Sequence, residues 1–501
     1  MTLVFMRPAL ALKYIDAFEY LSAATALFDG RGLLALSGQA QTIFPPGYPL
    51  AIVASMLVVR DPVKAAVFVS LLSSSLSLAL TFSLLRRWQG ALIASIATAL
   101  FALMPLRVWM AQSALSESLT LASLLLAVWA YTRQQWSPGI RGIVVGLALG
   151  WAYLTRPEAL LIAAGMLVLA TIQARRGKQA WTFIIVTAAV LCCIVMPYVV
   201  WLHAQTGAWT LSGKTGNFAI AAVRAHASQD VEWRRLNGDR SAIVAAAPML
   251  TLRDMAAHYL SNLRIERDRI LANIGVEPFA GMLLVWGLLG VLRRAAQRRD
   301  GEQVALLLIL LAPLAVFPLL WIEDRFLIQA APILTLGVAT GVAECVAWLQ
   351  HAWKDTWRRA HFWSAFIGVA CITAIGSSYI LRSYTTTFSE DATRASREIA
   401  ALISAQAPGR SSEAVIGEYP GVAYFAGLRQ EWLPSDDLSA VRQYATQKHV
   451  RFLVCSPQDV QTPATARLLA GDFSTKEARL IGSVRAGEIE LLVYQLVPWA
   501  E

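Results

Sequence analysis

The chain has 501 residues, of which 56% are hydrophobic and only 15% are charged. This composition excludes an ordinary soluble protein and is typical of one that crosses a membrane several times. Lys and Arg number 43 against 33 Asp and Glu, which gives a net charge of +10. In so apolar a chain this excess favours orientation in a bilayer over nucleic-acid binding, so no nucleic-acid partner is predicted.

The segment before the first long apolar run, residues 1–62, has no stretch that can cross a membrane. Residues 1–12 are apolar but too short, and they lack the charged start of a signal peptide. We therefore expect either a preceding span outside this sequence or a first helix with its N-terminus outside. Pro-Pro-Gly-Tyr-Pro at 45–49 interrupts any helix, and the apolar residues 50–59 are too few to span, which predicts a helix along the membrane interface.

Apolar runs suited to membrane-spanning helices begin after this segment. Two of them, 142–155 and 157–172, are short and meet at Arg156-Pro157, which indicates a helical hairpin. We predict ten spans, with approximate bounds 63–85, 90–107, 115–131, 142–155, 157–172, 180–203, 279–292, 303–321, 327–348 and 362–381.

Basic residues in the short loops predict the orientation of these spans, because Lys and Arg are retained on the cytoplasmic side. One alternate set of loops holds fourteen Lys and Arg, whereas the opposite set holds three. The first set is therefore predicted to be cytoplasmic. Residues 1–62, the long loop 204–278 and residues 382–501 then share the outer face.

The composition changes at about residue 385 to that of a soluble domain. Short apolar strands alternate there with helical stretches at Ala392–Ala405 and Ser435–Gln447, and Pro434-Ser435-Asp436-Asp437 is typical of a turn followed by a helix N-cap. We predict a helical membrane bundle over 63–381 and a small α/β domain over 385–501. The predicted strands are Ala414–Gly417, Arg451–Cys455, Ala478–Val484 and Ile489–Leu496.

Polar motifs recur at the predicted outer ends of the spans. D-x-x-E-Y begins at Asp16 and is followed by A-x-x-L-x-x-G-x-G and P-P-G-Y-P-L; later come A-L-S-E at 114–117, L-T-R-P-E at 154–158 and E-D-R-F at 323–326. In this order and on one face, they resemble the GT-C superfamily of polytopic glycosyltransferases. The narrower similarity is to the bacterial branch related to the dolichyl-phosphate-mannose protein mannosyltransferases and the lipid A aminoarabinose transferase. It covers about residues 14–381, and the soluble tail resembles the extracytoplasmic domain appended in that branch.

The resemblance implies sugar transfer from a polyprenyl-phosphate carrier at the outer face of a bacterial inner membrane, by a multi-pass protein with an extracytoplasmic tail. Asp16 matches the family's catalytic aspartate, so it is predicted to be the general base of an inverting reaction, and Glu19 is predicted to assist it. A phosphate leaving group favours a nearby cation over a general acid. The predicted partners are the lipid-linked donor, membrane lipids, and a lipid, glycan or protein acceptor. No cofactor and no metal site are predicted.

Further candidate residues come from the same outer loops. Arg156 and Arg325 are the only guanidinium groups in two short outer loops, which makes them candidates to bind the carrier phosphate. Lys214 and Arg224 in the long loop are secondary candidates. The predicted substrate-binding residues are Tyr20, Tyr48, Glu117, Arg156, Glu158 and Arg325.

Each of these residues also has a purely structural interpretation. Asp16 and Glu19 can be solvated acids beside an interfacial helix. Glu117 can be a helix N-terminal charge, and residues 156–158 can be the turn of a helical hairpin. Residues 323–325 can pair internally.

Two other functions compete with glycosyl transfer. A transporter or lipid flippase predicts charged residues in the middle of spans, or inverted repeats with broken helices. Here the polar residues gather at one rim. An inactive scaffold would bind partners through its tail and would tolerate replacement of Asp16.

Overall fold

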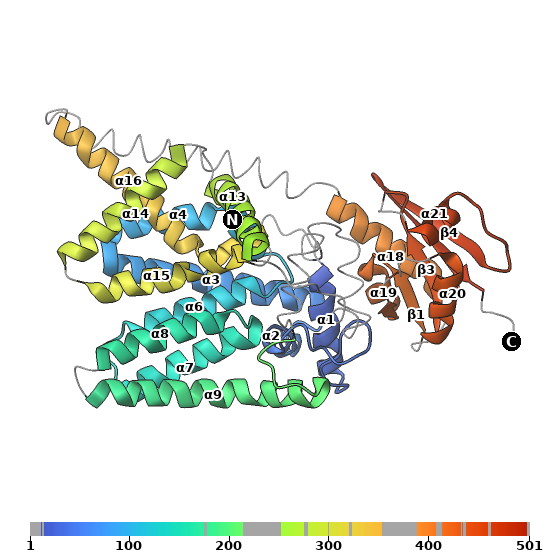
Figure 1. Cartoon of the computed structure of the whole chain (residues 1–501), viewed down its shortest axis with the longest axis horizontal. Helices are drawn as coiled ribbons and strands as arrows, with labels where there is room; N and C mark the ends of the chain where they lie inside the picture. The colour runs from blue at the N-terminus through green and yellow to red at the C-terminus, as the bar shows by residue number, and fades with distance from the viewer. Residues whose placement is uncertain are drawn as a thin grey trace.

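The computed structural model shows an elongated molecule with a bundle of apolar helices and a smaller sheet domain at one end (Figure 1). Most of the N-terminal half of the chain is described, whereas several stretches of the C-terminal half are not. The described residues are 12, 15–174, 178–213, 252–274, 279–298, 300–319, 323–352, 388–406, 413–431, 433, 437–458 and 462–497.

Two short helices precede the long ones. Helix α1 spans Ile15–Phe28, and α2 spans Gly47–Met56 directly after the proline pair. Gly47 lies against the end of α7, where an added Cβ would come within 2.6 Å of the Leu154 carbonyl. Only glycine therefore lets α2 pack at this position. The predicted short helix after the prolines is confirmed, although no membrane is present to test its depth.

The apolar bundle contains a helix for each of the first nine predicted spans, while the tenth, 362–381, lies outside the described residues. Five of these helices are long and apolar enough to cross a membrane: Pro62–Gln89, Pro138–Thr155, Ala180–Thr206, Gly301–Leu319 and Ala331–Trp348. The helices of the bundle are α3 (Pro62–Gln89), α4 (Ala91–Leu103), α5 (Pro105–Met110), α6 (Glu117–Tyr131), α7 (Pro138–Thr155), α8 (Ala159–Ala174), α9 (Lys178–Thr206), α14 (Phe279–Gln297), α15 (Gly301–Val316) and α16 (Ala331–Ala352).

The predicted span 90–107 is divided in the structure. Helix α4 ends at Leu103, and α5 begins at Pro105 after an extended Met104. Proline has no backbone N–H to continue a helix, and it disfavours helical geometry in the residue before it. Arg107 therefore belongs to a separate short helix and not to the end of a span.

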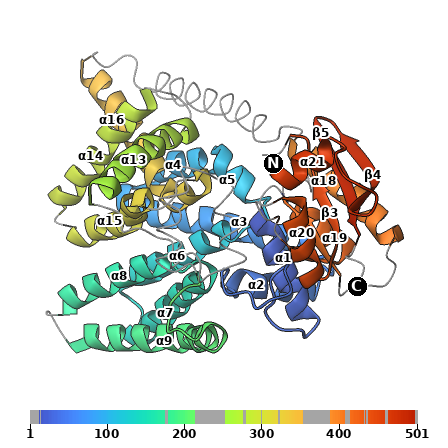
Figure 2. The ribbon, with the colours of Figure 1, turned by 45° about the vertical axis from the view of Figure 1, so that its right-hand side comes forward.

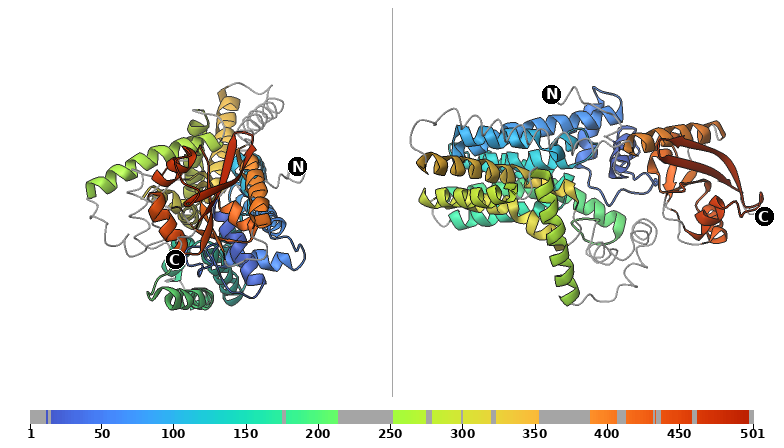
Figure 3. Two further views of the ribbon diagram at one scale, coloured as in Figure 1. Left: turned by 90° about the vertical axis from the view of Figure 1, so that its right-hand side faces the viewer. Right: turned by 90° about the horizontal axis from the view of Figure 1, so that it is seen from above.

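Close helix packing in the bundle depends on glycine. Gly142, Gly146 and Gly150 line the side of α7 that faces α9, and a Cβ at any of them would lie within 3.0 Å of α9 atoms. Small residues at this spacing allow two helices to approach closely without a hydrophobic drive between them. Across the bundle, α13 (Leu252–Ile274) lies transversely and packs on the 3-10 turn η3 (Phe317–Leu319) (Figure 3).

The C-terminal domain is a mixed five-stranded sheet of order β2-β1-β3-β5-β4. The first three strands pair in parallel, whereas β5 is antiparallel to β3 and to β4. Its strands are β1 (Ala414–Gly417), β2 (Arg429–Glu431), β3 (Val450–Cys455), β4 (Ala478–Ala486) and β5 (Ile489–Leu496), and its helices are α18 (Phe388–Gln406), α19 (Pro420–Ala426), α20 (Leu438–Gln447) and α21 (Pro463–Leu469).

The predicted α/β tail and its four strands are confirmed. Strand β2 was not predicted, because its three residues are polar and carry no apolar alternation. Asp437, the last residue of the predicted turn, caps α20, with its side chain accepting a hydrogen bond from the Ala440 N–H. The domain lies beyond α1, so that α1 stands between the bundle and the sheet (Figure 2).

Candidate active site

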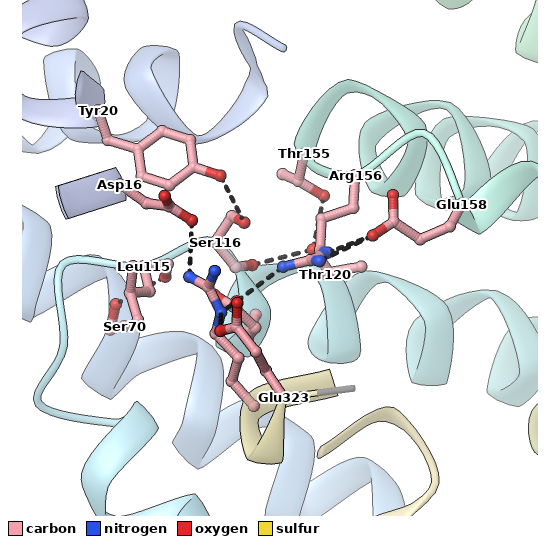
Figure 4. Close-up of polar contacts among 12 residues, drawn as sticks. Asp16, Tyr20, Ser70, Leu115, Ser116, Thr120, Thr155, Arg156, Glu158 and Glu323 are labelled. Carbon is pink, nitrogen blue, oxygen red and sulfur yellow. Dashed lines mark hydrogen bonds and ion pairs between the residues drawn. The ribbon is translucent and has the colours of Figure 1, made fainter. Parts of the chain in front are cut away.

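A cluster of charged side chains forms at the end of the bundle nearest the C-terminal domain (Figure 4). The contributing segments are far apart in sequence: α1, the start of α6, the α7–α8 junction, and the 3-10 turn η4 (Asp324–Gln329) with the residue before it. The cluster consists of Asp16, Glu117, Arg156, Glu158, Glu323 and Arg325.

Local backbone geometry directs these side chains toward one another. Arg156 ends α7 with an extended backbone (φ −150°, ψ 117°), because Pro157 follows it. Glu117 is the first residue of α6, where the helix dipole favours a negative charge. Glu323 has extended geometry and precedes η4, which carries Arg325 in its first turn.

Arg325 is the centre of one set of ion pairs. Its Nη1 donates to Asp16 Oδ2 at 2.6 Å, and its Nε lies 2.6 Å from Glu323 Oε2 and 3.5 Å from Glu117 Oε1. The side chain is buried, with a relative exposure of 7%. Burial alone would lower the pKa of Arg325, but the nearby carboxylates of Asp16, Glu117 and Glu323 outweigh it and raise the pKa well above its ordinary value.

Arg156 forms the second set and shares one carboxylate with the first. Its Nη1 donates to Glu117 Oε1 at 2.7 Å, and its Nε donates to Glu158 Oε1 at 2.8 Å. The Phe326 ring lies near both guanidinium groups, 5.0 Å from the Cζ of Arg156 and 5.5 Å from that of Arg325. Glu117, only 1% exposed, thus bridges two arginines beside an aromatic ring.

The cluster is not electrically balanced. Four carboxylates (Asp16, Glu117, Glu158 and Glu323) surround two guanidinium groups, which leaves a net charge of −2 when all six groups are ionised. Buried ion pairs are usually no more stabilising than apolar packing, and charged groups at membrane depth are rare without a functional reason. We therefore interpret the cluster as a functional site.

Tyr20 lies beside the cluster, whereas Tyr48 is one ring further away. The Tyr20 hydroxyl is 3.0 Å from Ser116 Oγ, and burial raises its pKa, with added effects from Glu117 and Asp16. Tyr48 is fully buried, its ring packs edge-on against Tyr20, and its hydroxyl contacts Ser70 Oγ at 2.9 Å. Tyr20 can thus contact a bound molecule, while Tyr48 supports it from behind; substrate binding by either one stays a prediction.

Glu19 is directed to a different place from Asp16. Its Oε2 accepts hydrogen bonds from the Leu36 N–H at 3.0 Å and from Gln41 Nε2 at 2.7 Å. Burial raises the pKa of Glu19 to about 7, against the opposing effect of these two hydrogen bonds and with a further contribution from Asp16. Glu19 therefore anchors the loop between α1 and α2, and its assistance to a base stays a prediction.

Several site residues were not predicted individually. Ser116 bonds to Tyr20, and Thr120 Oγ1 donates to Thr155 Oγ1 at 2.9 Å beneath the charged cluster. Phe326 could have been found from its place in the E-D-R-F motif. The internal pairing anticipated for residues 323–325 is present, but Arg325 also reaches Asp16 and Glu117.

Two other predictions concern cations. Lys214 and Arg224 lie outside the described residues. Within the described part of the chain, no group of three His, Cys, Asp or Glu side chains is arranged to hold a metal ion.

Comparison with known proteins relates part of this chain to a family. Residues 44–201 match the family model of dolichyl-phosphate-mannose-protein mannosyltransferases. Among curated proteins, none matches the chain by sequence. The crystal structure of ArnT from Cupriavidus metallidurans bound to undecaprenyl phosphate aligns over 98% of this chain and 96% of its own, with a TM-score of 0.57 and 12% identity. The family match covers about a third of the chain, and the structural likeness assigns the chain the fold of ArnT.

Other solved structures agree with this assignment. ArnT in the apo state aligns over 95% of this chain and 93% of its own, with a TM-score of 0.55 and 12% identity. The oligosaccharyltransferase of Archaeoglobus fulgidus, tethered to an acceptor peptide, aligns over 88% of this chain and 65% of its own, with a TM-score of 0.53 and 13% identity. The resemblance to the GT-C superfamily and the predicted fold class are confirmed.

The distribution of charge along the helices of the bundle also bears on the transporter alternative. In the described helices of the bundle, charged side chains lie near the helix ends, apart from Glu344 in the second half of α16. A transporter would need polar groups around a site at the middle of the membrane. The buried charged cluster instead lies where α1, the start of α6, the end of α7 and η4 meet, and α1 is the helix that contacts α19 of the C-terminal domain.

Proposed function

We propose that this GT-C protein transfers a sugar from a polyprenyl-phosphate donor to an acceptor at the extracytoplasmic face of a bacterial inner membrane. The observation that carries the proposal is the convergence of Asp16, Glu117, Arg156 and Arg325 at one rim of an apolar bundle. ArnT, which shares the fold, binds undecaprenyl phosphate in its crystal structure. A membrane-embedded bundle with charged groups at its rim suits a substrate with an apolar tail and a charged head.

Asp16 is the general base in this proposal. The acceptor hydroxyl forms a bond to the anomeric carbon, its proton passes to the Asp16 carboxylate, and the bond from that carbon to the phosphate oxygen breaks. Attack and departure on opposite faces of the sugar invert the anomeric centre. Arg325 holds the carboxylate in place through the 2.6 Å hydrogen bond, so the base is oriented before substrate arrives.

The two arginines bind the phosphate of the donor and later of the released carrier. Phosphate oxygens match the fork of a guanidinium group and replace weaker partners on it. Among the carboxylates paired with Arg156 and Arg325, the Glu158 and Glu323 side chains are the more exposed, at 35% and 25%. These two carboxylates move aside for the phosphate, while Glu117 keeps both arginines in position.

The prenyl tail runs along the apolar surface at the α2 end of the bundle. Leu57 and Val58 at the end of α2 are 73% and 86% exposed, which is costly in water and favourable against lipid. Gly47 at the start of α2 packs on the end of α7 beside Arg156. Leu57 and Val58 lie at the other end of α2, about 15 Å along its axis, so the tail would follow α2 away from the arginine.

A sugar-transfer assay that compares wild type with a variant lacking the Asp16 carboxylate tests the proposal. Purified protein in liposomes is incubated with radiolabelled polyprenyl-phosphate sugar, and wild type is compared with Asp16→Asn. The variant is expected to lose turnover and to keep donor binding, because the amide cannot accept the proton. The matched control is Asp29→Asn, which changes an exposed acid just after the same helix, paired only with Arg31 in the described residues. Equal turnover in Asp16→Asn and wild type would exclude Asp16 as the base.

The predicted orientation needs a separate test, because it rests on loop charges alone. A cysteine placed at Asp29 in a chain without its native cysteines is expected to react with a membrane-impermeant thiol reagent added outside intact cells. Labelling only after the membrane is opened would place the site in the cytoplasm and would contradict the proposal.

A further inference from the structure

Helix α1 presents two different faces to its surroundings. Residues 16 and 18 are separated by about 200° around a helix, whereas 16 and 20 share a face. Asp16 and Tyr20 accordingly contact the charged cluster and Ser116. Phe18 points the other way, to the C-terminal domain, where its ring lies 5.7 Å from the Tyr424 ring and 6.2 Å from the Phe425 ring.

The contact between Phe18 and α19 is tight. Phe18 is only 6% exposed, and a Cβ added at Gly421 would lie 3.0 Å from Phe18 Cζ. A side chain at Gly421 would therefore press on the tip of the Phe18 ring, and also on Ser396 of α18, which lies 3.2 Å from the added Cβ. One helix of the tail, α19, therefore forms the packing surface for Phe18, because it carries Gly421, Tyr424 and Phe425.

A second connection joins α1 to the tail through the loop between α1 and α2. The Leu36 N–H donates to Glu19 on α1, and the Leu36 carbonyl accepts a hydrogen bond of 3.2 Å from the Gln430 N–H on β2. Gln430 is itself fixed in the sheet, because its Nε2 donates to the Gly417 carbonyl. The Leu36 backbone thus links the helix of Asp16 to the edge strand of the C-terminal sheet.

We propose that the C-terminal domain positions Asp16. Phe18 is the positioning residue, and it packs against α19 at Gly421. This inference rests on the proposed function, in which Asp16 is the base. Helix α1 has 14 residues, a length that is marginal for an isolated helix, so its placement depends on tertiary contacts. A small displacement of a catalytic group lowers the rate far more than it lowers the stability of the fold.

Variants on both sides of the contact test the inference in the full-length protein. Phe18→Ala and Gly421→Val are each expected to lower kcat about tenfold. The donor KM should stay within about twofold, because the arginines that bind phosphate are untouched. In the double variant, the space left at position 18 accepts the valine, so kcat should fall less than the product of the two single effects predicts.

The matched control is Phe473→Ala, which removes another edge-on aromatic contact of the tail, with the Tyr494 ring at 5.6 Å, away from α1. Its kcat should stay within about twofold of wild type. A tenfold fall in this control would show that the tail acts only through its overall stability and would overturn the inference. Full kcat in Phe18→Ala, alongside an inactive Asp16→Asn, would also overturn it while the proposed function stands.

Hydrogen exchange gives a readout that needs no turnover. The amides of residues 15–28 should exchange faster in Gly421→Val than in wild type and in Phe473→Ala, because the valine side chain occupies the space into which Phe18 packs. If wild type transfers no sugar from the lipid-linked donor, the proposed function fails. The exchange result then still decides whether the tail holds α1, and unchanged exchange in Gly421→Val would reject that coupling.

Discussion

Both ends of the helical bundle hold paired charged groups, but these are organised differently. At the end away from the tail, Arg294 Nη2 lies 2.5 Å from Glu344 Oε1, and Arg298 Nη1 donates to the Trp88 carbonyl. The Arg294 and Glu344 side chains are 26% and 29% exposed, and they form one balanced pair. This pair joins α14 to α16 and needs no further partner to explain it.

The end beneath the tail departs from this pattern in every respect. Arg325 and Asp16 are 7% and 8% exposed, and the surrounding cluster has more carboxylates than arginines. Buried charges add little to stability on average and gather at functional sites, and the more exposed carboxylates of this cluster are partners that a bound phosphate can replace on the arginines. Four predictions test this contrast, from the largest expected effect to the smallest.

Asp16→Asn should lower kcat by about 10²- to 10⁴-fold, the range expected for loss of a general base. Glu344→Gln makes the same kind of change at the opposite end and should leave kcat within about twofold. Transfer of radiolabel from the donor measures both. Similar losses in the two variants would mean that the ends do not differ in function.

Arg325→Ala should lower the free energy of unfolding by about 3–5 kcal/mol, because it removes the arginine paired with the buried Asp16 carboxylate and leaves Glu117 with Arg156 alone. Arg294→Ala should cost about 1 kcal/mol, because its pair is partly exposed. Denaturant unfolding in detergent compares the two. The contrast fails if Arg294→Ala is the more damaging change.

Glu19→Gln should remove a pH dependence of stability. Burial raises the pKa of Glu19 from its ordinary value of 4.5 to about 7, so the folded state binds this proton more tightly than the unfolded state does. Its contribution, on the order of 3 kcal/mol, is therefore complete below about pH 4.5 and is lost as the pH rises through about 7. Unfolding midpoints measured across this range should decline less steeply in Glu19→Gln. An unchanged slope would contradict the assignment.

Glu158→Gln should strengthen binding of undecaprenyl phosphate about two- to fivefold, because it removes an exchangeable partner of Arg156. Titration of the lipid in nanodiscs measures the dissociation constant. Glu398→Gln, which removes an exposed partner of Arg394 in the tail, serves as the control and should have no effect. Weaker binding in Glu158→Gln would assign Glu158 a direct contact with substrate.

Much of the fold could be predicted from the length and periodicity of apolar stretches in the sequence. The apolar runs of α3, α7, α9 and α16 are long enough to reveal their helices, and the strands β1, β3, β4 and β5 show apolar stretches between turns. Strand β2 and the break before Pro105 were missed. A three-residue edge strand is defined by its partner, and the break lies inside an otherwise continuous apolar stretch.

The candidate site could be predicted from the sequence only in part. Motif order directed attention to Asp16, Glu117, Arg156 and Arg325, and the structure brings all four together. The sequence did not indicate that the Glu19 side chain points away from that of Asp16, toward the Leu36 N–H, although the two residues are only one helical turn apart.

The sequence alone determined that this chain is a polytopic helical protein with an α/β tail, because hydrophobic length and periodicity are local properties that each segment carries by itself. It also determined which residue types were available at the helix ends. Only the tertiary structure decided that Glu117 is shared by two arginines and that Phe18 rests on a helix of the tail, because these contacts join residues hundreds of positions apart. Packing geometry sets such pairings, and no local pattern encodes it.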